Sequence, residues 1–388
     1  MSDVPYATPG ALTVFRRAAM ASDFEAAFNE SQDEDFADAA LDALDEVDRV
    51  EEALSVFRPT SAASRLNLLG ADMSVRVDEE LWNWIETAIR LGEETEGAFD
   101  VAAAPLWRVW GFANRDGEFP KEEERRRALE LSGIRHLRLN PEDRSIAFDE
   151  PGVELNFGAI GKGIALDLAA AKLEERGAFN FLVQGGKSGV VARGGRVGDY
   201  SPETLAFLKG DDEEEDPEID EESGLPRRGA QSGAQDALDA LLPDALRPDA
   251  ALLAEERLRD APTGWTIGVA HPLAPEKRIG ELWLRDRALA TSGSTWQFFR
   301  AGGKRYSHIV DPRTGFPTTG VLSTTVLAPT ATEADALSTA FFVLGPEKTE
   351  EFCRRRPDVA ALMILEREID PGYELATFNL PAEVFRAL

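Results

Sequence analysis

Residues 155–163 read Leu-Asn-Phe-Gly-Ala-Ile-Gly-Lys-Gly, a glycine-rich segment between two apolar stretches. The pattern predicts a strand at Val153–Phe157, a turn, and a helix from about Gly163 to Arg176. Glycines there let the backbone approach a ligand closely, and the new helix offers free N–H groups to an anion. Lys162 adds a positive charge suited to phosphate. The spacing is not that of a nucleotide-binding P-loop, so the turn is either another kind of phosphate site or a structural connection.

The chain on either side mixes helical and strand patterns. Asp35–Phe57 and Asp78–Glu96 have apolar residues at helical spacing, and in the first of these Leu41 and Leu44 are expected to face the core. Further strands are expected at residues 136–140, 145–149, 179–184, 189–192, 265–269, 281–285, 308–310, 322–328 and 360–365, the last being the final strand. Because these elements intermix without a regular βαβ repeat, the predicted fold class is α+β.

The composition is strongly acidic. The 388 residues carry 42 Lys and Arg against 71 Asp and Glu, which gives a formal net charge of −29. Nucleic-acid binding depends on cationic side chains that displace counterions, and anionic membranes also attract basic surfaces. We therefore expect neither a nucleic-acid partner nor a stable membrane anchor. Without an apolar segment typical of a secretion signal or a membrane span, the expected location is cytoplasmic.

Residues 211–222 concentrate this acidity, with ten acids in twelve positions. Such a run repels itself and stays solvated, and it lies within a longer stretch rich in Asp, Pro, Ala and Gly. We interpret residues 200–262 as a disordered acidic insertion. The predicted organisation is an N-terminal segment at 1–34, a single folded domain built from 35–199 and 263–388, and this insertion between its two parts.

The composition leaves oxygen atoms as the ligands for any metal site. The chain has one cysteine and three histidines, too few for a cysteine cluster or a multi-histidine centre. Asp335 and Thr339 lie four residues apart on a helix expected at Glu333–Leu344, so both project from one face near its start. Together they could supply two oxygens to Mg²⁺. Alternatively, Asp335 is an acid that the helix dipole favours at this end.

A second candidate segment, Tyr306–Pro317, is polar and rich in turn-forming residues. Its histidine, His308, could act as a general base near neutral pH. A packed, hydrogen-bonded histidine in a strand is the alternative interpretation. Aromatic residues within 97–100 and 107–112 could line a pocket for a planar ligand, or they could belong to the core.

Taken in chain order, these segments resemble the ApbE family, the FAD:protein FMN transferases, over nearly the whole length outside residues 200–262. The matching stretches are Phe57–Ser61 with Ser64–Asn67, Gly97–Asp100 with Pro105 and Leu106, Trp110–Phe112, Gly158–Gly163 with Asp167, Thr291–Gly293, Tyr306–Pro317 and Ala334–Thr339. The resemblance implies a two-lobed α+β fold related to the T-fold, in which a single catalytic domain holds a flavin in a cleft between the lobes.

The resemblance also implies the ligands and the residues that hold them. FAD would bind across these segments, with Mg²⁺ on its pyrophosphate. The metal ligands would be Asp335, Thr339 and the backbone carbonyl of Ala159. The FAD contacts would be Phe57, Ala98, Phe99, Asp100, Asn156, Lys162 and the backbone around His308 and Ile309.

The implied reaction is transfer of FMN from FAD to a Thr or Ser hydroxyl of an acceptor protein, with release of AMP. His308 would be the catalytic base, and Asp311 is the second candidate for that role. The implied acceptor motif, Ser/Thr-Gly-Ala-Thr, does not occur in this chain. Two alternatives remain open: an FAD pyrophosphatase that gives FMN and AMP, and a non-catalytic FAD-binding protein.

Some positions depart from the family pattern. Met20-Ala21-Ser22 stands where Met-Gly-Thr is usual, and Asn156 stands where an acid is common. Lys187 replaces the usual Asn or Asp after a pair of glycines. None of these departures affects the three expected metal ligands.

Overall fold

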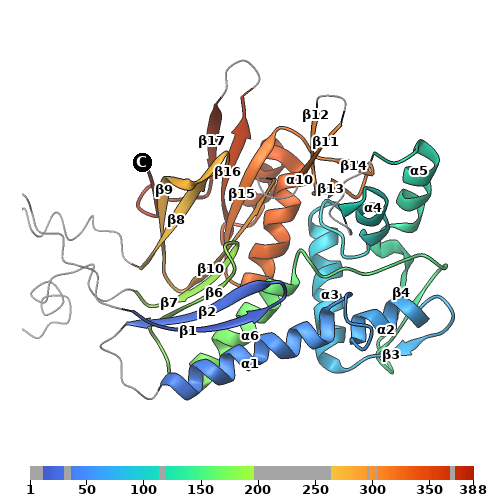
Figure 1. The fold of residues 1–388 in the computed structure, drawn as a ribbon, viewed down its shortest axis with the longest axis horizontal. Coiled ribbons are helices and arrows are strands. Elements are labelled where there is room, and N and C mark those ends of the chain that lie inside the picture. The colour runs from blue at the N-terminus through green and yellow to red at the C-terminus, as the bar shows by residue number, and fades with distance from the viewer. Residues whose placement is uncertain are drawn as a thin grey trace, which may run out of the picture. The chain divides into compact units, whose positions relative to one another are not determined.

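An eight-stranded sheet lies at the centre of the fold (Figure 1). Its order is β1-β2-β6-β7-β10-β15-β16-β17, and every neighbouring pair is antiparallel. The strands are β1 (Leu12–Ala19), β2 (Ser22–Asn29), β6 (Phe181–Gly185), β7 (Gly189–Arg193), β10 (Arg287–Gly293), β15 (Val321–Ala328), β16 (Ala360–Glu366) and β17 (Tyr373–Phe378). Antiparallel pairing of strands that are distant in the chain defines a mixed sheet-and-helix fold, not a doubly wound one.

This computed structural model describes residues 12–29, 36–112, 119–195, 264–294, 298–301, 304–367 and 372–388. The chain divides into two units, one formed by residues 1–10 with 197–262 and the other by 11–196 with 263–388. All the described residues belong to the second unit. The acidic insertion expected at 200–262 therefore lies outside the described residues.

Three helices cover one face of the sheet: α1 (Phe36–Leu54), α6 (Gly161–Glu175) and α10 (Ala331–Arg355). They share a buried core with aromatic side chains of the sheet, such as Phe24 and Phe181. Alanines and glycines on the helices allow close packing. At Gly163, an added Cβ would lie 2.3 Å from the backbone oxygen of Ala331, so α6 and α10 approach each other where no side chain fits.

A three-stranded sheet covers the other face of the main sheet. Its order is β18-β9-β8, with β8 (Trp265–His271), β9 (Ala274–Leu284) and β18 (Phe385–Ala387). Side chains alternate along β10, so that Ala288 and Ala290 belong to the helix-side core while Leu289 packs in the core beneath β8 and β9. The end of β10 therefore presents residues to both sides of the main sheet.

A second lobe, which we call the helical lobe, contains the four helices α2–α5 and a small sheet of order β3-β5-β4 (Figure 1). Asp78 caps α3 by accepting a hydrogen bond from the backbone N–H of Leu81 at 2.8 Å. The elements are α2 (Ala62–Leu69), α3 (Glu79–Glu94), α4 (Ala104–Val109), α5 (Glu122–Leu131), β3 (Val75–Arg76), β4 (Leu137–Asn140) and β5 (Ser145–Phe148). Two short hairpins pair β11 (Phe298–Ala301) with β12 (Lys304–Ser307) and β13 (Val310–Asp311) with β14 (Phe316–Pro317).

The mixture of antiparallel sheets and helices confirms the predicted α+β class. Other expectations were wrong in detail. Leu41 is 47% exposed, because the buried face of α1 is centred on Ala43, Val47 and Val50, on the other side of the helix from Leu41. The stretch at residues 153–157 is not a strand. Sequence periodicity also missed β1 and β2, and it missed β17 and β18, which follow the expected final strand.

Candidate functional site

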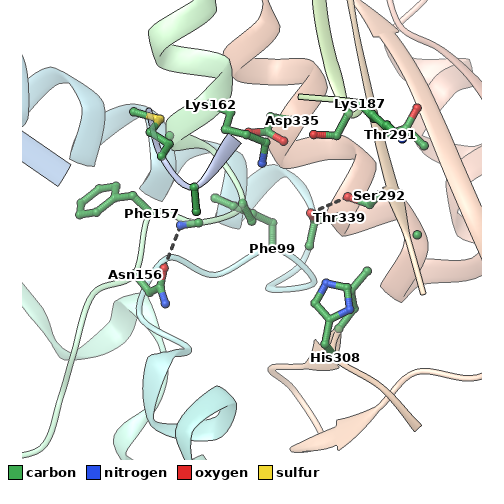
Figure 2. Close-up of a pocket in the computed structure, with 18 of the residues that line it drawn as sticks. Phe99, Asn156, Phe157, Lys162, Lys187, Thr291, Ser292, His308, Asp335 and Thr339 are labelled. Atoms are coloured by element: carbon green, nitrogen blue, oxygen red, sulfur yellow. Dashed lines mark hydrogen bonds between the residues drawn. The ribbon is translucent and has the colours of Figure 1, made fainter. Parts of the chain in front are cut away.

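A cavity of about 1160 Å³ opens at the end of the main sheet, and residues of both lobes line it. Its walls come from the β1–β2 turn, the loop after α1, residues 98–104, the glycine-rich turn before α6, the β6–β7 turn, β8, the end of β10, residues 308–312 and the first turns of α10. Figure 2 shows that side chains distant in the sequence converge on this space.

The structure brings nearly all the expected site residues together. The lining includes His308, Phe57, Ala98, Phe99, Asp100, Asn156, Lys162, Ile309, Ala159, Asp335 and Thr339. Asp311 is not among the lining residues. Its carboxylate is paired with Arg313, with Oδ1 accepting from Nε at 2.9 Å and Oδ2 accepting from the guanidinium at 3.0 Å. The Asp311 carboxylate therefore holds a turn beside the cavity.

Asp335 and Thr339 project from the first turns of α10 into the cavity (Figure 2). Asp335 is only 6% exposed, and its Oδ2 accepts the backbone N–H of Gly163 at 3.1 Å. The hydroxyl of Thr339 lies 3.0 Å from that of Ser292 on β10, and the Ser292 hydroxyl lies 2.8 Å from that of Ser338. Sequence reasoning matched the segment around Ser292 but gave this residue no role, because its contact with α10 depends on the folded sheet.

A partly buried acid on α6 holds the start of α10 in place. Asp167 accepts the backbone N–H groups of Ala331 at 2.7 Å and Thr332 at 2.9 Å, and it accepts the Thr332 hydroxyl at 2.6 Å. Burial raises the pKa of Asp167, while these hydrogen bonds act in the opposite direction. Asp167 thus satisfies N–H groups that a helix start leaves without internal partners. The helix that carries Asp335 is locked to α6 at two points.

The glycine-rich turn presents Lys162 and the start of α6 to the cavity. Lys162 lies in the first turn of α6, and its side chain is near Asp335 in Figure 2. The side-chain oxygen of Asn156 accepts the N–H of Gly158 at 2.8 Å, so this side chain shapes the turn. The positive end of a helix and a lysine together form a favourable site for an anion.

Two of the expected flavin contacts, Asp100 and Phe57, differ in the direction and exposure of their side chains. The Asp100 carboxylate is turned toward the backbone, where it accepts the N–H of Ala102 at 2.8 Å and that of Ile134 at 3.1 Å. Burial raises the pKa of Asp100, and the two backbone hydrogen bonds oppose that shift. Phe57 is 74% exposed at the rim, so its ring is available to a planar ligand. Asp100 therefore shapes the wall, whereas Phe57 offers a contact surface.

The segment at residues 306–318 places His308 on the side of the cavity that faces Ser292 and Thr339. In Figure 2 the imidazole of His308 lies below Thr339 and Ser292 and points toward them. Its ring makes an edge-on contact with Phe112, with centroids 6.4 Å apart. The carbonyl of Ile309 accepts both the N–H and the hydroxyl of Thr318, at 3.0 and 3.1 Å. The backbone that follows His308 is therefore fixed by hydrogen bonds.

The donor set suits a hard cation that shares its coordination with a ligand. Among the described residues, no group of three or more His, Cys, Asp or Glu side chains could by itself hold a metal. Asp335 and Thr339 offer oxygens at the cavity wall, and Ala159 lies in the adjacent turn. Mg²⁺ is typically bound by one or two carboxylates together with substrate phosphates and water. The residues present therefore fit Mg²⁺ in the company of a phosphate ligand.

Comparison with solved structures defines the fold. An ApbE protein from Thermotoga maritima matches with a TM-score of 0.70 at 24% identity, covering 95% of this chain and 97% of that one. The flavin transferase ApbE from Vibrio cholerae matches with a TM-score of 0.69 at 23% identity, covering 95% and 98%. The architecture is thus that of the ApbE proteins.

No helix in the described ranges is long and apolar enough to span a membrane.

Sequence comparison then gives the family. Residues 20–206 and 252–363 match the ApbE family, and the chain belongs to that family. The FAD:protein FMN transferase of Escherichia coli K12 is 26% identical over 316 residues, which cover 80% of this chain and 72% of that protein. The FAD:protein FMN transferase of Treponema pallidum is 29% identical over 333 residues, covering 83% and 76%. The unmatched residues 207–251 fall within the expected acidic insertion.

Proposed function

We propose that this chain is an Mg²⁺-dependent FAD:protein FMN transferase that moves FMN from FAD to a Thr or Ser hydroxyl of an acceptor protein and releases AMP. The names of the curated relatives support the reaction class. The observation that carries the proposal is the convergence of Lys162, Asp335 and Thr339 on one cavity where α6 and α10 begin. A cytoplasmic location stays a prediction from the sequence.

The pyrophosphate of FAD fits this part of the cavity best. The start of α6 offers backbone N–H groups, and Lys162 offers a positive charge, so two anionic phosphates are stabilised there. Asp335, Thr339 and the Ala159 carbonyl would hold Mg²⁺, which when bound neutralises phosphate charge and stabilises the charge that develops at phosphorus. The links from Asp167 and Gly163 keep α10 in register with the glycine-rich turn.

His308 is the proposed general base. The acceptor oxygen attacks the phosphorus of the FMN half, the bond from that phosphorus to the bridging oxygen breaks, and AMP leaves with that oxygen. The hydroxyl proton passes to the imidazole of His308, which faces the Ser292–Thr339 pair (Figure 2). Asp311 is less suited to this role, because Arg313 occupies both its carboxylate oxygens and it does not line the cavity.

One assay separates transfer from the two alternatives. The protein is incubated with FAD, Mg²⁺ and an acceptor protein that carries Ser-Gly-Ala-Thr, and covalent flavin fluorescence and free AMP are both measured. A fluorescent acceptor with equimolar AMP is the expected result. AMP without a labelled acceptor would mean a pyrophosphatase, and FAD binding with neither product would mean a flavin carrier.

The role of His308 has its own control. His308→Gln should slow transfer by about 100-fold or more while FAD still binds, because general-base catalysis typically contributes 10²–10⁴-fold. His136→Gln is the matched control, since that ring contacts the Glu130 carbonyl at 2.8 Å outside the cavity. Equal rates for the two variants would remove His308 from the mechanism.

A further inference from the structure

Part of the cavity wall is formed by residues that have no proposed contact with FAD or Mg²⁺. The end of β10 divides the space, with Ser292 on the side of α10 and Leu289 and Thr291 on the side of β8 and β9. The Thr291 hydroxyl lies 2.8 Å from that of Thr325 on the neighbouring strand. We call the space on the β8 side the β8 arm. Its lining residues are Ile267, Gly268, Val269, Ala270, His271, Leu282, Leu289, Thr291, Ser323 and Thr325.

The β8 arm meets β8 along the edge of the strand. Successive side chains of a strand point to opposite faces, so a cavity on one face would touch every second residue. Instead, all the residues from Ile267 to His271 line the arm, including Gly268, which has no side chain. The pairing with β9 is regular from Trp265 to Val269, so a bulge does not account for this contact at Ile267–Val269. The backbone of β8 therefore borders the arm, together with the side chain of Leu282 on β9.

That edge is open among the described residues. The small sheet has the order β18-β9-β8, and β8 pairs there only with β9. A strand edge without a partner presents a row of N–H and C=O groups that can receive another strand. An extended polypeptide is the ligand that satisfies such a row, since its own backbone supplies the complementary donors and acceptors.

The charge distribution separates this arm from the FAD side. The lining residues of β8, β9, β10 and β15 include no Lys, Arg, Asp or Glu, and Ile267, Leu282 and Leu289 are apolar. Lys187, on the β6–β7 turn beside the end of β10, is the nearest charged lining residue. The anionic pyrophosphate is best placed beside Lys162, on the far side of β10. The complementary occupant of the β8 arm is therefore an uncharged, extended chain with small side chains.

The cavity is larger than a typical site for one drug-sized molecule. Sites for a single small molecule commonly enclose about 300–1000 Å³, and this cavity encloses about 1160 Å³. Transfer requires FAD and an acceptor hydroxyl to be present together, so one continuous space must admit both.

We propose that the acceptor protein docks as an added strand on the free edge of β8, where an uncharged segment carries its Thr or Ser hydroxyl through the β8 arm toward His308. This inference rests on the proposed function, and it identifies how that function takes its second substrate. Main-chain hydrogen bonds supply the affinity, and the small arm limits the side chains on each side of the hydroxyl.

A backbone-modified peptide tests the docking mode directly. A ten-residue peptide that contains Ser-Gly-Ala-Thr is the probe, and each of its amides in turn is N-methylated. Strand addition predicts that methylation lowers labelling by about tenfold or more at every second residue and has little effect at the residues between them, because alternate amides face β8. Hydrogen exchange should show slower exchange at residues 267–271 when the peptide is added to the FAD-loaded enzyme.

A pair of variants tests the site on the enzyme. Ala270→Trp places a large ring at an exposed position that lines the arm, and it should raise the KM for the peptide about tenfold or more while the Kd for FAD stays unchanged. Thr266→Trp is the matched control, since Thr266 is exposed on the same strand but does not line the cavity. It should leave the KM unchanged.

Each contrary outcome has a defined meaning. If N-methylation of the peptide does not change its labelling, or if Ala270→Trp does not weaken labelling, strand addition is overturned while the proposed transfer stands. Weaker FAD binding in Ala270→Trp, with protection of residues 267–271 by FAD alone, would assign the arm to the flavin and also overturn the proposal. A peptide that is neither labelled nor protective overturns docking at β8, and labelling of the whole acceptor protein in the earlier assay then decides separately whether transfer occurs.

Discussion

The backbone N–H of Gly163 donates a hydrogen bond to Oδ2 of Asp335 at 3.1 Å, and it joins the first turn of α6 to the second turn of α10. The two residues are far apart in the sequence, yet both belong to helices whose starts face the same cavity. Because the bond ends on the carboxylate itself, it fixes the orientation of the proposed metal ligand. The position of that carboxylate thus depends on how closely the two helices pack.

Gly163→Ala should disrupt this packing. A Cβ at Gly163 would lie 2.3 Å from the carbonyl oxygen of Ala331 and 2.7 Å from the Cα of Thr332, both backbone atoms that cannot move aside without shifting α10. We expect a loss of about 2 kcal/mol or more in the free energy of unfolding, as in other overpacked cores, together with weaker FAD binding. Urea unfolding and FAD titration measure these effects.

Gly161→Ala is the control for this prediction. The nearest atom to its added Cβ is 3.7 Å away, so the methyl group fits within the same helix. Its unfolding free energy should stay within about 1 kcal/mol of the parent protein, the difference in helix propensity between the two residues. Equal stability of Gly163→Ala and Gly161→Ala would show that the helices do not meet as described.

Asp335→Ala should abolish metal-dependent turnover and leave the fold intact. The carboxylate is the one acidic side chain among the three proposed ligands, and its removal should lower AMP release in the presence of Mg²⁺ by at least about 100-fold, given the several kcal/mol that a catalytic metal supplies. The rise in Tm that Mg²⁺ and FAD produce together should also disappear.

Glu333→Ala controls for the general loss of an acid at the start of α10. Glu333 pairs with Arg356 at 3.3 Å and does not line the cavity, so its removal should preserve metal dependence. Unchanged activity in Asp335→Ala would refute its assignment as a metal ligand.

Asp167→Asn should destabilise the protein and loosen the site. Asp167 accepts three hydrogen bonds from Ala331 and Thr332, whereas an amide would present an NH₂ group to one of those N–H donors. The expected loss of unfolding free energy is about 1–3 kcal/mol, the usual consequence of an unsatisfied buried group. FAD affinity should fall as well, because α10 carries Asp335.

Asp78→Asn provides the comparison. Asp78 caps α3 with one bond to the Leu81 N–H at 2.8 Å, and Asn caps helices about as well as Asp. Its unfolding midpoint in urea should stay close to that of the parent protein. A similar small effect for Asp167→Asn would mean that its hydrogen bonds do not hold α10.

Several helices and strands could be predicted from the sequence because their signals lie within a few neighbouring residues. Helices α1 and α3 follow apolar periodicity, and α3 begins directly after Asp78, as the sequence predicts. The expected hairpin at residues 136–149 forms as β4 and β5. The candidate site residues were found by the order of short motifs, which periodicity does not supply.

The rest depends on contacts between distant segments. β1 and β2 join the main sheet because β2 pairs with β6, and nothing in residues 12–29 indicates that partner. The roles of Ser292 and Asp167 arise from α10 packing against β10 and α6. The β8 arm could not be predicted from the sequence for the same reason, since an open strand edge is a property of a sheet and not of a sequence pattern.

Ala21→Gly should stabilise the protein. Met20 and Ala21 form the β1–β2 turn with φ values of 51° and 55°, the left-handed region that glycine adopts without strain. A residue with a Cβ costs about 1–2 kcal/mol there, so we expect a gain of about 1 kcal/mol. Ala18→Gly, in the extended part of β1, should instead lose about 0.5–1 kcal/mol. Urea unfolding distinguishes the two signs, and destabilisation by Ala21→Gly would contradict the turn geometry.

Cys353 should be inert in the folded protein and should make stability depend on alkaline pH. Its side chain is 1% exposed on α10, and burial raises the pKa of the thiol to about 12 from an ordinary value of 9.0. Because only the thiolate reacts readily, a disulfide reagent at pH 8 should label the protein in urea but not the native chain. The raised pKa favours folding fully below the unfolded value, and this contribution is lost as pH rises from about 9 toward 12. Cys353→Ala should flatten that part of the pH–stability curve, and rapid labelling of the native chain would show that the thiol is accessible.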